Sequence, residues 1–146
     1  GARPLAKDVA VVLDAEFDGG ARLHGYTADP PVLAPGAVVN MTLFWQGSIP
    51  FGAKVLVHLR DADNNTIAQA DHFIYDNKVP SSRWPDVLES ETVIRDGAVL
   101  RVPPELPRGN YRLLVGFYHP QTFERLGVLN DQSGESAIIL GEWTVE

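Results

Sequence analysis

The chain has 146 residues, a formal net charge of −7 and no cysteine. This length is typical of one domain that buries a sizeable core, and 45% hydrophobic with 21% charged residues disfavours disorder, collagen and coiled coils. The acidic balance disfavours nucleic acid and anionic membrane surfaces as partners. The lack of cysteine excludes disulfides and thiolate metal sites, and no apolar run indicates a membrane span or a signal peptide.

Apolar and polar residues alternate along several short segments in the first half of the chain, which is the pattern of half-buried strands. Glycine, proline and Asx residues separate these segments and favour turns. Residues 61–65, DADNN, predict an Asx-rich hairpin turn between two of the strands. The predicted strands are residues 9–17, 22–28, 39–45, 54–60 and 66–71.

The second half begins with a long irregular stretch, residues 76–90, which contains two prolines and Trp84. Loops of this length are uncommon in compact domains. Strand patterns then resume in residues 91–94, 99–102, 111–118, 123–128 and 137–145.

The spacing of these segments predicts an all-β fold, a single domain over residues 1–146. We expect an immunoglobulin-like antiparallel β-sandwich of eight or nine strands. Tyr111 supports this topology, because a tyrosine that opens a strand after a corner can turn its hydroxyl back to the upstream backbone.

The three tryptophans have different predicted roles. Trp45 and Trp143 share parity with aliphatic neighbours, which favours core packing. Trp84 lies on the long loop, where it either pins the loop against the sandwich or forms a platform for a ligand.

A metal site is not expected. Residues 61–65 resemble the start of a calcium loop, but Thr66 replaces its glycine and His72 replaces its terminal glutamate, so a hairpin turn is the preferred interpretation. His58 and His72 lie on adjacent predicted strands without a clear third ligand.

Catalysis is not expected either. No nucleophile elbow, phosphate loop or nucleotide fingerprint is present. Carboxylates near the long loop are unremarkable in so acidic a chain; they are Asp61, Asp71, Asp76 and Glu89.

A series of short motifs resembles a known family. The family is the β-sandwich domain that is appended, outside the membrane, to bacterial multi-spanning glycosyltransferases of the dolichyl-phosphate-mannose protein mannosyltransferase type. The resemblance extends over residues 11–145, and the order of the motifs carries it. They are residues 22–26, 35–36, 42–45, 57–61, 69–71, 82–84, 93–96, 102–103, 106–111, 116–118 and 125–126.

The chain departs from the family pattern in two turns. Asn64-Asn65 replaces a glycine of the hairpin turn, and Pro85-Asp86 replaces a Pro-Gly, but both changes keep turn chemistry. The resemblance transfers no catalytic residues, because the working carboxylate of such enzymes belongs to their membrane part.

The resemblance implies a non-catalytic, extracytoplasmic accessory module, on the bacterial cell surface or the periplasmic side of the membrane and possibly tethered to a membrane domain. Such a module is expected to need no cofactor and to recognise glycan or a neighbouring protein segment. A purely structural surface or assembly module without a small ligand is the alternative. An open reading frame with membrane spans upstream distinguishes a tethered module from a free one.

If the ligand is a glycan, the long loop and its flanks are the predicted binding surface. Trp84 and Tyr75 are expected to stack on sugar rings, because aromatic faces pack on the C–H groups of pyranoses. Asp71 and Arg83 are expected to make the polar contacts.

Overall fold

The computed structural model describes residues 11–31, 33–49, 52–74 and 93–146. Within these ranges the chain forms eight strands and one short 3₁₀ helix, η1 (Asp18–Gly20). No helix there has the length and apolarity needed to span a membrane. The strands are β1 (Val11–Glu16), β2 (Ala21–Asp29), β3 (Val38–Gly47), β4 (Lys54–Arg60), β5 (Thr66–Gln69), β6 (Ile94–Arg101), β7 (Gly109–Tyr118) and β8 (Ile138–Val145).

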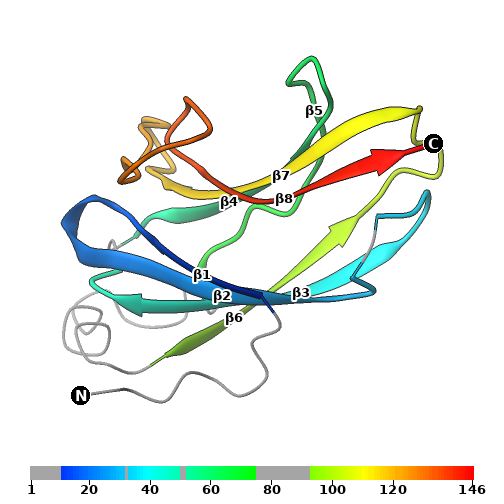
Figure 1. The fold of residues 1–146 in the computed structure, drawn as a ribbon. Coiled ribbons are helices and arrows are strands. Elements are labelled where there is room, and N and C mark those ends of the chain that lie inside the picture. The colour runs from blue at the N-terminus through cyan, green and yellow to red at the C-terminus, as the bar shows by residue number, and fades with distance from the viewer. Residues whose placement is uncertain (1–10, 32, 50–51, 75–92) are drawn as a thin grey trace.

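The strands form two four-stranded antiparallel sheets that face each other as two layers (Figure 1). One sheet has the order β1-β2-β3-β6 and the other the order β5-β4-β7-β8. The chain passes between the sheets after β3, after β5 and after β6. The all-β sandwich predicted from the sequence is therefore confirmed, with eight strands in the described ranges.

Alternation along the strands builds the core, as the sequence predicts. The inward residues of β7 are Tyr111, Leu113, Val115 and Phe117, all nearly inaccessible to solvent. Trp45 is fully buried, and its ring centroid lies 4.6 Å from that of Phe117. Phe17 completes an aromatic cluster, with its centroid 5.9 Å from Trp45 and 5.1 Å from Phe117.

A polar group is enclosed within this core and joins the two sheets. Asp96 of β6 is 2% exposed and accepts a hydrogen bond from Trp45 Nε1 at 3.0 Å. His72, which follows β5 in the other sheet, donates from Nε2 to the same carboxylate at 2.8 Å. Its Nδ1 lies 2.8 Å from the carbonyl oxygen of Ala70, so both ring nitrogens face acceptors, which favours the protonated form of the ring.

The hairpin between β4 and β5 is the predicted Asx turn. The Asp61 carboxylate accepts hydrogen bonds from the backbone N–H groups of Asp63 at 2.9 Å and Asn65 at 2.8 Å. Asn64 has a φ of 64°, a left-handed conformation that asparagine tolerates well. Asparagine at this position therefore fits the conformation that the turn requires.

Two strand predictions are wrong in detail. Residues 123–128 form an irregular segment with single bridges at Arg125 and Val128, and its first residue, Phe123, has a φ of 63°, far from the extended values of a regular strand. Residues predicted as separate strands around 91–94 and 99–102 belong to one strand, β6, and residues 91 and 92 lie outside the described ranges.

The corner contact predicted for Tyr111 is present. Its hydroxyl donates to the carbonyl oxygen of Pro107, four residues upstream. Tyr111→Phe is expected to lower the free energy of unfolding by about 1 kcal/mol, because the hydrogen bond between the buried Tyr111 side chain and this carbonyl is lost. Denaturant titration of both proteins measures this difference, and an unchanged midpoint would show that the hydroxyl contributes nothing.

Candidate functional site

The candidate site lies on the outer face of the β5-β4-β7-β8 sheet, beside the chain that follows β5. Alternation turns His58 of β4 and Tyr118 of β7 to this face, opposite to the core residues of both strands. Leu56 and Leu114 form a small buried apolar cluster there with Ala137. The polar and aromatic side chains of the site therefore lie next to this buried apolar cluster, and Tyr118 packs against it.

Asp71 is the centre of the polar contacts. One carboxylate oxygen accepts the backbone N–H of Val57 at 2.9 Å, and the carboxylate also accepts from His58 Nε2 at 3.2 Å. The hydroxyl of Tyr118 donates to it at 3.0 Å. These three donors fix the carboxylate and orient both rings.

The same contacts set the protonation states of the site. Burial alone raises the pKa of Asp71, but the hydrogen bonds from His58, Val57 and Tyr118 outweigh it and hold that pKa below its usual range. Burial and the hydrogen bond to Asp71 raise the pKa of Tyr118 to about 12. At neutral pH the carboxylate is thus ionised and the phenol is a neutral donor.

A chain of charged groups continues from His58. Its Nδ1 accepts from Arg60 at 3.0 Å, since a guanidinium only donates, and Nε2 is then the donor to Asp71. Arg60 is paired with Glu135 at 3.0 Å. Arg125 donates to the Glu135 carbonyl oxygen at 3.1 Å and lies 3.7 Å from its carboxylate.

Phe123 is the most exposed aromatic residue among those described. It is 69% exposed, and its ring is stacked on Tyr118 with centroids 6.0 Å apart and planes 22° apart. Its φ of 63° is in the left-handed region, which costs a bulky residue roughly 1–2 kcal/mol. The backbone thus holds a large apolar ring in solvent in a conformation that glycine or asparagine adopts more easily.

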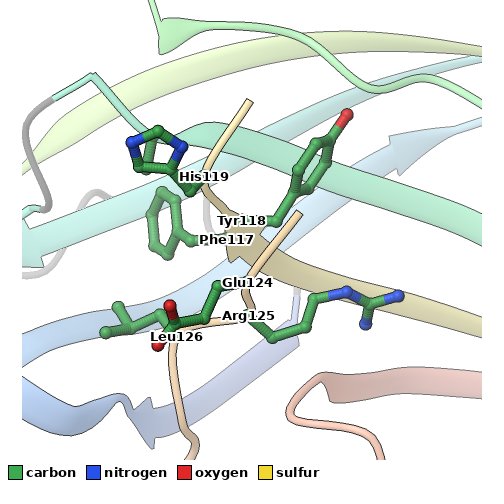
Figure 2. A pocket seen from close by; sticks show the side chains of 7 residues that line it. Phe117, Tyr118, His119, Glu124, Arg125 and Leu126 are labelled. Carbon is green, nitrogen blue, oxygen red and sulfur yellow. The ribbon is translucent and has the colours of Figure 1, made fainter. Parts of the chain in front are cut away.

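Two pockets share Tyr118 and Arg125 as lining residues. The first, which we call the near pocket, has a volume of about 320 Å³ and contains His58, Asp71, Gln69 and Phe123 in its lining. The second, the far pocket, has a volume of about 220 Å³ and is bounded by Ala53, Phe117, His119, Glu124 and Leu126 (Figure 2). Arg125 and Tyr118 are partners in an isolated β-bridge, and Figure 2 shows their side chains on the opposite side of the two backbone segments from Phe117 and Leu126.

Of the residues predicted for glycan contact, the structure places Asp71 in this site. Trp84, Tyr75 and Arg83 lie outside the described residues. Tyr118, Phe123 and Arg125 were not predicted as site residues. The parity of Tyr118, opposite to the buried face of its strand, was a usable signal, whereas Phe123 was hidden by its assignment to a strand.

The two histidines considered for a metal site do not converge. His58 pairs with Asp71 on the outer face, whereas His72 pairs with Asp96 inside the sandwich. Among the residues that the structure describes, no three histidine, cysteine or acidic side chains are grouped to hold a metal ion.

In comparisons with known proteins, no protein-family model matches the chain, and no curated protein matches it.

Proposed function

We propose that the chain is a non-catalytic accessory module of a bacterial membrane glycosyltransferase or surface protein, acting outside the cytoplasm and recognising glycan. The observation that carries this proposal is Phe123, an exposed ring held in left-handed backbone beside a polar groove. Strained residues cluster at functional sites, and an exposed aromatic face beside fixed donors and acceptors is suited to a pyranose.

The residues that carry the family resemblance support the proposal. His58, Arg60, Asp71, Tyr118 and Arg125 come from four separate motifs of the sequence, and they meet in this site through the contacts described above. Their convergence gives the scattered motifs one shared location.

The strand order and the Tyr111 corner support an immunoglobulin-like topology. In that topology, strands A, B and E share one sheet and strands C, F and G the other. Here β2, β3 and β6 occupy one sheet, and β4, β7 and β8 the other, in the corresponding chain order.

The protonation states support a binding role. A catalytic acid or base works best with a pKa near the operating pH. Asp71 has a lowered pKa and Tyr118 a pKa of about 12, so both are moved away from neutrality. Each is suited to accept or donate a hydrogen bond without transferring a proton.

Phe123→Asn tests the proposal. Asparagine tolerates the left-handed backbone, so relief of strain offsets the lost ring stack, and the free energy of unfolding should change by less than about 1 kcal/mol. Glycan affinity, expected at millimolar to high micromolar Kd for a shallow surface, should fall about tenfold or more. A glycan array followed by titration calorimetry measures the affinity.

Val99→Asn is the matched control. Val99 is 46% exposed on β6 of the other sheet, so its substitution also removes an exposed apolar side chain and should leave binding unchanged. A purely structural module is the second candidate, because Asp71 already has three internal donors. The purely structural role is favoured over glycan binding if the wild type binds no bacterial surface glycan and Phe123→Asn unfolds the domain.

A further inference from the structure

The chain that follows β5 departs from the regular hydrogen-bond ladder with β4 at one place. In an antiparallel ladder, every second opposed pair of residues exchanges two backbone hydrogen bonds. Val55 and His72 do so, at 2.7 and 3.0 Å. In the next such pair, Ala70 donates to the Val57 carbonyl oxygen at 2.8 Å, but the Val57 N–H donates at 2.9 Å to the Asp71 carboxylate. A side chain of the candidate site therefore takes the place of a ladder acceptor.

The ladder acceptor that this arrangement leaves open, the Ala70 carbonyl, is bound by His72. The Nδ1 atom of His72 lies 2.8 Å from the Ala70 carbonyl oxygen, and its Nε2 donates to Asp96. The bond to Ala70 requires a proton on Nδ1, because a deprotonated ring nitrogen and a carbonyl oxygen are both acceptors. The bond to the carboxylate is charge-assisted and therefore stronger, so Nδ1 is the nitrogen that loses its proton first. The His72 side chain is 16% exposed, which lets this proton exchange with solvent.

Two carboxylates among the described residues act on the His72 ring: Asp96 from β6 and Asp71 from its own segment. Burial alone lowers the pKa of His72, but Asp96, the Ala70 carbonyl and Asp71 outweigh it and raise that pKa above its usual value. The described part of β3, which provides Trp45, has no charged residue. The other charged or titratable side chains of β4 and β6 alternate with core residues and face outward; they are Lys54, His58 and Arg60 of β4 and Arg95 and Arg101 of β6.

From this geometry we propose that His72 is a pH switch for the candidate site on the outer face. While Nδ1 is protonated, it occupies the Ala70 carbonyl, and the Val57 N–H fixes the Asp71 carboxylate in the near pocket. When Nδ1 loses its proton to solvent, the Ala70 carbonyl is free to accept the Val57 N–H and complete the ladder pair. Asp71 then loses one of its three donors. This inference rests on the proposed glycan-binding function, and glycan affinity should fall as the pH rises through the titration of His72.

NMR couplings across hydrogen bonds identify the acceptor of the Val57 N–H in the intact chain without any ligand. Below pH ~6 the Val57 amide nitrogen should couple to the side-chain carboxyl carbon of Asp71, and above pH ~8.5 to the carbonyl carbon of Ala70. The midpoint of this change should coincide with that of the His72 ring, a comparison that needs no variant.

Two glutamine variants separate the histidines on either side of Asp71. His72→Gln cannot titrate, so the acceptor of the Val57 N–H should stay the same over this pH range. His58→Gln is the matched control, because it removes the histidine that contacts Asp71 on the outer face. It should keep the pH-dependent change of acceptor.

Titration calorimetry with neutral methyl hexopyranosides measures the effect on binding, since these probes do not titrate in this range. Between pH ~6 and ~8.5 the Kd should rise about fivefold more in the wild type than in His72→Gln, a typical coupling between two sites. This comparison cancels the direct titration of His58 in the site. By reciprocity, a saturating sugar should raise the pKa of His72.

The outcomes distinguish the switch from the proposed function. A Val57 N–H that keeps one acceptor while His72 titrates, or a change of acceptor that persists in His72→Gln, would overturn the inference and leave glycan binding in place. A change of acceptor in a chain that binds no glycan of the array at either pH would overturn the proposed function, and with it the control of affinity, but not the switch at Val57.

Discussion

Asp96→Ala is expected to lower the free energy of unfolding by about 3–5 kcal/mol, because removing one partner leaves the other groups of a buried polar cluster uncompensated. The wild-type carboxylate is 2% exposed and accepts from Trp45 Nε1 and from the His72 imidazolium. Its loss leaves two enclosed donors without an acceptor. Urea denaturation near pH 6 measures the difference, and Asp63→Ala, in the exposed β4–β5 turn, should change stability by less than about 0.5 kcal/mol.

The same substitution should flatten the dependence of stability on pH. Burial alone lowers the pKa of His72, but the hydrogen bond and charge of Asp96, the Ala70 carbonyl and the charge of Asp71 raise it above 6.5. A raised folded-state pKa stabilises the protein below the unfolded value, and this contribution is lost as pH rises through the folded value. The free energy of unfolding of the wild type should therefore fall as the pH rises above about 6.5. In Asp96→Ala most of this fall should be absent. Parallel declines in the two proteins would contradict the pairing.

Gly47→Ala is the second substitution expected to have a large effect. Gly47 ends β3 with a φ of +84°, and an added Cβ would lie 2.2 Å from the carbonyl oxygen of Gly20. The left-handed backbone costs roughly 1–2 kcal/mol, and displacing a backbone carbonyl adds roughly 1–3 kcal/mol. We expect a loss of about 3 kcal/mol or more in the free energy of unfolding, measured by denaturant titration.

Gly19→Ala separates the two causes. Gly19 has a φ of +85°, almost the same as Gly47, but an added Cβ meets nothing within 4 Å. This control should lose only the conformational part, about 1–2 kcal/mol. Equal losses of unfolding free energy in both variants would mean that the close approach of Gly47 to Gly20 does not contribute to the effect.

Most strands were predictable because each buries one face, and burial of one face imposes strict alternation on the sequence. The interval from Lys54 to Arg60 illustrates this, because its predicted and observed bounds coincide. The prediction of a strand from Phe123 to Val128 failed because the backbone of this segment is determined by contacts with distant residues, which the local apolar pattern does not show. Gly127 lies so close to the Asp18 side chain that a Cβ would meet its carboxylate at 2.3 Å. Packing between residues so far apart in the chain produces no periodic pattern of apolar residues in the local sequence.

The site was predictable only in part for a related reason. Asp71 was chosen as a polar residue near the long loop, and its carboxylate does meet an aromatic residue. The partner is Tyr118, which is 47 residues away in the chain. The two residues come together because the sheet order places β4 between β5 and β7. Sheet order determines that meeting, and local sequence patterns give strand positions without giving sheet order.

Asp71 and His72 are consecutive residues whose side chains point to opposite faces of the sheet. One carboxylate orients Tyr118 and His58 outside, while the next side chain is tied to Asp96 within the core. The position of the Asp71 carboxylate is therefore set when the sandwich folds, before any ligand arrives. The proposed binding surface is therefore preorganised at this point, and a ligand bound there would not bear the entropic cost of ordering these side chains.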